Sequence, residues 1–408
     1  MSDTLCVLPF NQLSVGTTGD LRLCCNSLAG PIEDNNASVM VNGQTDLKFF
    51  TESPHLNSIR KTLLAGGRPK ECGRCWTMEK AGQQSFRNFA NGEYVTTFNR
   101  LLSGDTSVSL EYLNFDLGNK CNIACRMCHP YSSSLLAKEM AHGKGELSND
   151  EVASANGALR DAEALAWFEK PEFWEMIKPR LKEVRRVYLI GGEPFLIPEH
   201  LKLLDLLIEY GLPKEITLSY NSNLSVFPER IFDRWRKFKT VKVQASIDGI
   251  NKVYEYIRWP MKFDRIAANL NLLREERLEN VLLSIHATIQ NLNVSYLTEL
   301  LDFFYGMDIV FIPVHRPSYL SVSVMPFEEL KLALAKLEDY QRKLKPSRSG
   351  HFERAVEEAV RFVSDAVRNY VPQPELQAQF LKSMAFYDRR RNQSLLEVHP
   401  YFKPWTEL

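Results

Sequence analysis

Between residues 106 and 325, short apolar segments alternate with amphipathic ones, and this alternation constrains the fold more than any other feature of the sequence. Strands that alternate with helices form βαβ units with a parallel sheet. We therefore expect an α/β fold. The predicted strands are 110–117, 186–190, 215–220, 241–247, 280–288 and 308–314, and the predicted helices are 198–210, 228–237, 263–274 and 295–305.

Six strands in this length fit a partial barrel as well as an open sheet. In both architectures, binding and catalysis take place beyond the carboxyl ends of the strands. We expect three domains: a loop-rich, cysteine-rich part at 1–105, the α/β part at 106–325, and a mostly helical extension at 326–408. The polar segment 143–165 is predicted to be a long insertion after the first of the six strands.

Charge and hydropathy narrow the function classes. Lys plus Arg and Asp plus Glu number 50 each, so no net field attracts nucleic acid or an anionic membrane. Met1 to Phe10 lacks the pattern of a signal peptide, and no window holds about 18 uninterrupted apolar residues. We expect a cytoplasmic protein that binds neither membrane nor nucleic acid.

All eight cysteines lie in the first 128 residues, which is not expected of scattered structural cysteines. In a reducing compartment, tight cysteine spacings indicate metal binding or catalysis rather than disulfides. Cys121, Cys125 and Cys128 form a C-x3-C-x2-C motif shortly after the first predicted strand of the α/β part. Three thiolates can hold three corners of a [4Fe–4S] cube and leave one iron open to a chelating ligand. A zinc site completed by His129 is the alternative.

This motif resembles that of the radical S-adenosylmethionine (SAM) superfamily, and the resemblance covers residues 108 to 315. It implies a partial (β/α)6 TIM-like barrel whose open iron binds the amino and carboxylate groups of SAM. One electron from the reduced cluster then cleaves SAM to methionine and a 5′-deoxyadenosyl radical. The chain departs from the family at Met127, where an aromatic residue is usual, although methionine can also pack against an adenine ring.

The resemblance also implies a set of SAM-binding positions at the ends of the second, third and fourth strands of that barrel. The second strand ends in a GGEP sequence, in which Glu193 is placed to accept from the SAM amino group and glycines permit close approach. Taken alone, these are ordinary turn sequences, and Arg258 could be a surface arginine rather than a partner of the SAM carboxylate. The predicted SAM-binding residues are Gly191, Gly192, Glu193, Pro194, Asn223, Ser246, Asp248 and Arg258.

The amino-terminal cysteines predict a second metal site. Cys6 and Cys24, with Gly19 between them, precede a C-x2-C pair at Cys72 and Cys75. A hairpin is expected across 17–19 and a helix at 56–64. This arrangement resembles the twitch domain, a one-cluster relative of the SPASM domain, and implies an auxiliary [4Fe–4S] cluster. Such a domain usually follows the barrel instead of preceding it, and a four-cysteine zinc site is the alternative.

Other positions are weaker candidates. Cys25 is a surplus thiol, either an alternative ligand or a buried side chain. Gln290 and Asn291, after the fifth strand of the barrel, are weaker candidates for contacts with SAM. His315 and Arg316 follow the sixth strand, where they would contact a substrate or be ordinary loop residues. The basic run 234–242 is read as a solvated helix face. The tail 386–405, with three consecutive arginines and several aromatics, would close the barrel mouth or bind a partner.

Together these features predict a radical SAM oxidoreductase or peptide-modifying enzyme with two [4Fe–4S] clusters and SAM. Its expected partners are a peptide or protein substrate and an electron donor such as flavodoxin or ferredoxin. Two alternatives stay open: a radical SAM dehydrogenase or epimerase of a small alcohol or sugar, and a non-catalytic metal-binding interaction protein.

Overall fold

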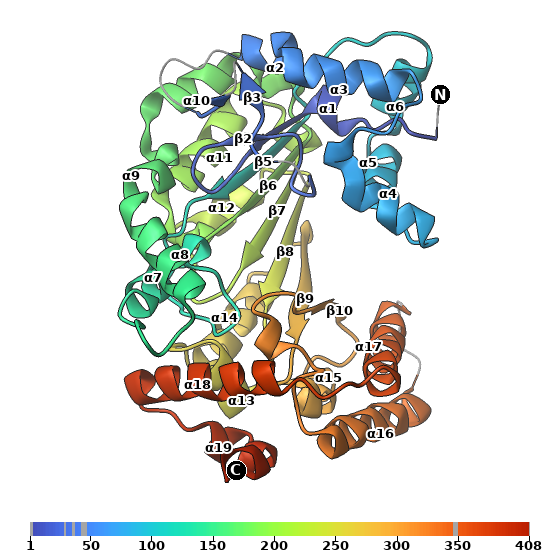
Figure 1. Ribbon diagram of the computed structural model, residues 1–408. Coiled ribbons are helices and arrows are strands. Elements are labelled where there is room, and N and C mark those ends of the chain that lie inside the picture. Colours follow the sequence, from blue (N-terminus) through green and yellow to red (C-terminus); the bar gives the residue numbers. More distant parts are fainter. Residues whose placement is uncertain (1–2, 28–29, 35–36, 42–46, 346–349, 408) are drawn as a thin grey trace. The chain divides into compact units, whose positions relative to one another are not determined.

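The computed structural model describes residues 3–27, 30–34, 37–41, 47–345 and 350–407 (Figure 1). Its contacts divide the chain into two compact units, each built from segments that are distant in sequence. Unit 1 comprises 1–119, 161–220 and 230–241, and unit 2 comprises 120–160, 221–229 and 242–408. The three-domain division expected from the sequence stays a prediction.

The main sheet confirms the α/β prediction. It has eight strands, mostly parallel, in the order β10-β9-β8-β7-β6-β5-β1-β2, and is consistent with a partial TIM-like barrel. The six predicted strands correspond to β5–β10, with ends that agree within two residues. The strands are β1 Gln12–Val15, β2 Leu21–Arg22, β5 Tyr112–Leu117, β6 Arg186–Gly191, β7 Thr217–Ser222, β8 Thr240–Ser246, β9 Val281–Ile289 and β10 Asp308–Pro313, while β3 Glu33–Asp34 and β4 Ala37–Ser38 form a separate pair.

The predicted hairpin at the amino terminus is present, but its first strand also extends the main sheet. Strands β1 and β2 pair antiparallel across a turn that contains Gly19, whose φ of +82° favours glycine. Strand β1 lies parallel to β5, with Gln12 opposite Tyr112 and Ser14 opposite Asn114. The sequence did not predict this pairing, because a four-residue strand carries no signal for its distant partner.

The parallel register in unit 1 gives the sheet two different faces, because successive side chains of a strand point in opposite directions. One face is fully buried and mostly apolar, and its paired rows are Leu113, Val187 and Leu218, then Phe115, Leu189 and Tyr220. The other face is polar, with the rows Tyr112, Arg186 and Thr217, then Asn114, Tyr188 and Ser219. Helices of unit 1 cover the apolar face, where Phe115 meets the rings of Trp167, Phe173 and Trp174 edge-on.

The expectation that residues 1–105 are loop-rich is wrong, because five helices of five to eleven residues occupy much of 48–102. Ser53 and Ser85 cap two of them by accepting from the backbone N–H of Leu56 and Asn88. The helices of unit 1 are α1 Leu8–Asn11, α2 Lys48–Glu52, α3 Pro54–Leu64, α4 Gly73–Lys80, α5 Phe86–Glu93, α6 Val95–Leu102, α9 Ala162–Leu165, α10 Pro171–Ile177, α11 Pro198–Tyr210 and α12 Ile231–Trp235.

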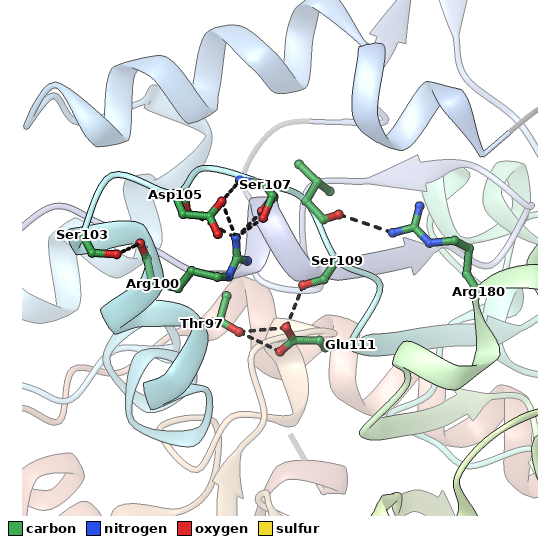
Figure 2. Close-up of polar contacts among 9 residues, drawn as sticks. Thr97, Arg100, Ser103, Asp105, Ser107, Ser109, Glu111 and Arg180 are labelled. Atoms are coloured by element: carbon green, nitrogen blue, oxygen red, sulfur yellow. Dashed lines mark hydrogen bonds and ion pairs between the residues drawn. The ribbon is translucent and has the colours of Figure 1, made fainter.

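Polar contacts attach helix α6 to the segment that leads into β5 (Figure 2). Thr97 Oγ1, on α6, donates to the Glu111 carboxylate at 2.8 Å, and Ser109 Oγ donates to it at 2.7 Å. Arg100, also on α6, donates to the Ser107 carbonyl oxygen at 2.8 Å. The segment between α6 and β5 has no regular secondary structure, and these hydrogen bonds fix its position.

Unit 2 contains the other α-helices of the described residues. The expected helical character of 326–408 is confirmed for the described residues of that segment. The predicted insertion at 143–165 is largely helical, because Ser148 and Glu151 form a capping box at the start of α8. The helices of unit 2 are α7 Ser134–Met140, α8 Asn149–Arg160, α13 Asn251–Ile257, α14 Phe263–Glu275, α15 Leu297–Phe303, α16 Phe327–Lys343, α17 His351–Arg368, α18 Pro374–Arg391, α19 Leu395–Val398 and α20 Lys403–Thr406. None of the described helices is long and apolar enough to cross a membrane.

We predict that Phe115→Ala destabilises the protein by about 3–5 kcal/mol, because it removes a buried ring and that ring's edge-on contacts with three neighbouring rings. Equilibrium urea denaturation measures the change. The control is Val371→Ala at a side chain that is 65% exposed, where we expect a change within about 0.5 kcal/mol. Equal unfolding midpoints for the two variants would contradict the assigned core.

Candidate functional site

The cysteine loop, defined here as residues 118–130 between β5 and the following short helix, is anchored by its backbone. In unit 2, the Ala124 N–H donates to the Trp259 carbonyl at 2.7 Å, and the Arg126 N–H donates to the Ile257 carbonyl at 2.9 Å. Ser133 Oγ donates to the Ile123 carbonyl at 2.6 Å. The loop therefore has a defined conformation that does not depend on its thiols.

Two polar side chains donate to thiols of this loop. Asn223 Nδ2 lies 3.8 Å from Cys121 Sγ, and Arg258 Nη1 lies 3.7 Å from Cys125 Sγ. Cys125 is buried, and the other two motif cysteines are half-buried. Because hydrogen bonds to sulfur and nearby cations stabilise a thiolate, these two donors favour the charged form that binds metal.

The charge state of the thiols follows from burial and from their neighbours. Burial raises the pKa of Cys125, and the Arg258 guanidinium partly opposes that rise. Burial and the neighbouring Cys125 raise the pKa of Cys128 to about 12. Protons therefore occupy these thiols until a cation replaces them. Three cysteines with donors on two of the sulfurs fit the three-thiolate cluster that the motif predicts.

Asp248 and Arg258 bind each other and are not on the surface. Arg258 Nε lies 2.6 Å from Asp248 Oδ2, both residues are buried, and Asp248 Oδ1 accepts from the Thr288 N–H at 2.7 Å. Burial alone would lower the pKa of Arg258, but Asp248 and Cys125 raise it overall. The alternative that Arg258 is a surface arginine is therefore wrong, and SAM binding by this pair stays a prediction.

The GGEP turn in unit 1 follows β6 and needs its first glycine. Gly191 has φ +126°, and a Cβ there would lie 2.7 Å from the Leu117 backbone nitrogen. The Gly192 N–H donates to the Gly118 carbonyl at 2.9 Å. The carboxylate of Glu193 is buried and accepts from the Phe195 N–H at 3.1 Å. Close approach of two backbone segments accounts for Gly191, and its predicted role toward SAM stays a prediction, as do those of Gly192, Glu193 and Pro194.

The remaining predicted positions differ in burial. Ser246 ends β8 and is half-buried. Gln290 and Asn291 are fully buried, and the Asn291 amide donates to the carbonyls of Tyr319 and Val324. The Asn291 amide is therefore used within the core of unit 2, and a contact of Gln290 or Asn291 with SAM stays a prediction. Asn223, by contrast, donates to the sulfur of a motif cysteine, Cys121.

A cavity of about 380 Å³ in unit 2 adjoins Cys128. His315 and Arg316 line it, in agreement with the expectation that they face a site. Asp150 and Glu151, at the start of α8, also line the cavity, and their carboxylates have the opposite charge to the Arg316 guanidinium. Burial and Arg316 lower the pKa of His129, which also lines this cavity. The pocket can therefore accept a polar group next to the cysteine loop.

The four predicted amino-terminal ligands come together in unit 1. Cys6, Cys24, Cys72 and Cys75 line one small pocket. Burial raises the pKa of Cys6 well above its usual value, and the other three thiols raise it further. Burial and neighbouring cysteines raise the pKa of Cys24 and of Cys72 to about 12. Asn26 Nδ2 lies 3.7 Å from Cys75 Sγ and can stabilise a thiolate there.

Cys25 is exposed, unlike the four thiols of this pocket. Although the residue as a whole is exposed, desolvation of its thiol by the surrounding atoms raises the pKa of Cys25, and the nearby Arg186 partly opposes that rise. Within the described ranges, no three His, Cys, Asp or Glu side chains meet the geometry of ligands to a single metal ion. The thiolates of a [4Fe–4S] cube each bind a different iron, which is a wider arrangement.

Two features of the site were missed by sequence reasoning. Arg126, between two motif cysteines, is 1% exposed and pairs with Asp388 of α18 at 2.7 Å. Asp116, near the carboxyl end of β5, accepts from Thr17 Oγ1 at 2.6 Å, and its buried Oδ1 has no hydrogen-bond partner among the described residues. The position of Arg126 inside the motif could have singled it out, but its partner lies 262 residues away.

Comparison with known families agrees with the cysteine motif. Residues 116–304 match the model of the Radical SAM superfamily. The matched segment is less than half of the chain, and it includes the three cysteines of the motif and strands β6–β9.

Solved structures with some similarity include anSMEcpe with bound AdoMet and Cp18Cys peptide, at 14% identity and a TM-score of 0.37. That match covers 57% of this chain and 60% of that one. Streptococcus suis SuiB bound to precursor peptide SuiA shows 16% identity and a TM-score of 0.37, with 73% and 65% covered. TYW1 with a lysine–pyruvate adduct bound shows 15% identity and a TM-score of 0.30, and the match covers 54% of this chain and 70% of that one. This chain thus spans less than two thirds of the length of anSMEcpe and of SuiB. No curated protein sequence matches the chain.

We predict that Asp116→Asn is more stable than the wild type above pH 6. Burial raises the pKa of Asp116 from 3.8 to about 6, so ionisation costs more in the folded state than in the unfolded one. Wild-type stability therefore falls as the pH rises from about 4 through about 6, by about 2–3 kcal/mol. Urea denaturation of both proteins between pH 4 and 8 tests this, and a difference that does not change with pH would refute it.

Proposed function

We propose that this protein is a radical SAM enzyme that cleaves SAM reductively and abstracts hydrogen from a C–H bond of a peptide or protein substrate. The observation that carries the proposal is the cysteine loop, whose three motif thiols have two donors directed at their sulfurs. It lies within the segment that matches the Radical SAM superfamily. A [4Fe–4S] cluster held by Cys121, Cys125 and Cys128 would supply the electron for SAM cleavage.

The chain's own residues prepare the loop for this charge. Arg258, held by Asp248, places a cation next to the buried Cys125 sulfur. Asn223 places a neutral donor next to Cys121. Such hydrogen bonds and charges stabilise the thiolates and help to set the reduction potential of a bound cluster.

For SAM itself, we propose the positions predicted from the resemblance. The Glu193 carboxylate would accept from the SAM amino group, and Ser246 with Asn223 would bind polar groups of the cofactor. Arg258 would act as a pair with Asp248, because the ion pair already occupies its Nε atom. The mixed charges around the cavity next to Cys128 suit a polar substrate group.

We also propose an auxiliary [4Fe–4S] cluster in unit 1, held by Cys6, Cys24, Cys72 and Cys75. The support is one small pocket that all four cysteines line, with the Asn26 amide directed at the sulfur of Cys75. Such a cluster would accept an electron or anchor the substrate. A flavodoxin or ferredoxin would reduce the first cluster.

Iron content and SAM turnover after anaerobic reconstitution test the first cluster. We expect about eight irons per wild-type chain and about four in a Cys121/Cys125/Cys128→Ala variant. With dithionite and SAM, 5′-deoxyadenosine should form only with the wild type. A fully loaded wild-type protein that forms none would favour a non-catalytic metal-binding protein.

A Cys6/Cys24/Cys72/Cys75→Ala variant tests the auxiliary site. We expect it to retain about four irons and to lose the remainder, while the Cys25→Ala control retains all of them. If the wild type instead holds one zinc that only the four-cysteine variant lacks, the site is a zinc site. Product analysis by mass spectrometry with peptides and with small alcohols or sugars separates the two substrate classes.

A further inference from the structure

The carboxyl-terminal part of the chain surrounds the arginine of the cysteine motif. Arg126 Nε donates to the Tyr256 carbonyl at 2.8 Å, and Nη2 donates to Asp388 at 2.7 Å and to Gln393 Oε1 at 3.0 Å. Its guanidinium carbon lies 3.7 Å from the centre of the Tyr256 ring. The remaining nitrogen, Nη1, lies 3.6 Å from Met384 Sδ. All three nitrogens therefore have partners outside the loop.

The two arginines near the motif have different orientations. Arg258 is directed at a cysteine sulfur, where it changes the electrostatics of the thiol. Arg126 is directed at α18 and the residues after it, and its own backbone N–H is bonded to Ile257. The side-chain contacts of Arg126 described above go to groups outside the loop, so they point to an effect on the position of the loop.

We propose that the Arg126–Asp388 ion pair is a positioning device by which α18 holds the cysteine loop in its cluster-binding conformation. The effect on a cluster rests on the proposed function, but the conformation of the loop can be measured in the metal-free protein. A buried cation that loses its partner is strongly unfavourable. Without Asp388, Arg126 would move toward water, and the backbone between Cys125 and Cys128 would move with it.

A second anchor makes this test feasible. Arg391, also on α18, binds Glu139 of α7 through two contacts at 3.0 and 2.6 Å. Asp388 Oδ2 accepts from the Leu395 N–H at 2.6 Å, a bond that asparagine retains through its side-chain oxygen. Asp388→Asn therefore removes the counter-charge while α18 keeps another attachment.

The first experiment is hydrogen–deuterium exchange of the metal-free protein. In Asp388→Asn, we expect the Ala124 and Arg126 amides to exchange at least about tenfold faster than in the wild type, while amides of β9 and β10 are unchanged. The control is Asp365→Asn, which removes the partner of Arg368 in an exposed ion pair of α17. Unchanged exchange in the loop, or the same effect in both variants, would overturn the proposal.

The second experiment follows iron release to a chelator from reconstituted protein. We expect Asp388→Asn to lose the cysteine-loop iron about tenfold faster, with the metal of unit 1 as the internal reference. An Arg126→Met/Asp388→Leu double variant should return toward wild type, because neither charge is left buried alone. Equal loss from both sites in Asp388→Asn would indicate a global defect and refute a positioning role. If wild-type protein takes up no iron on the loop, the proposed function fails, whereas the exchange experiment still decides the loop conformation.

Discussion

The parallel register of β1, β5, β6 and β7 is the constraint on which the rest of unit 1 depends. A slip of one residue would place Asn114, Tyr188 and Ser219 beneath the covering helices and would move Phe115 to the polar face of the sheet. The register therefore separates the apolar core of unit 1 from the polar face of the sheet, where Tyr112, Asn114 and Ser219 are also buried. Because these strands run in one direction, their carboxyl ends share an edge, and Asp116 and Gly191 lie there.

Both cysteine sites combine burial with local stabilisation of charge. Burial raises the pKa of Cys125 and of Cys6, which keeps the free thiols protonated. An amide donor is directed at a sulfur in each site, Asn223 at Cys121 and Asn26 at Cys75. In the cysteine loop, the Arg258 guanidinium also donates to the Cys125 sulfur. These features suit groups that ionise when metal binds, because the donors then interact with thiolates.

Local patterns predicted much of the fold. Strands β5–β10 and helix α11 were recognised because apolar periodicity and flanking turns are local signals. Helix α3 was also predicted, at 56–64, but the other short helices between residues 48 and 102 were missed, because each has few turns and the segment contains several glycines and cysteines. The pairing of β1 with β5 was also missed, since one hundred residues separate Ser14 from Asn114.

The sequence by itself determined the cysteine spacing, the α/β class and the turn that follows β6, because each depends on neighbouring residues. The tertiary structure decided which distant groups meet those residues. It bound Arg258 to Asp248 beside Cys125, and it brought Cys6 and Cys24 to Cys72 and Cys75. It also placed Asp388 on the arginine of the motif. No local sequence pattern predicts these contacts, because they depend on chain packing, which brings together charges and thiols that are far apart in the sequence.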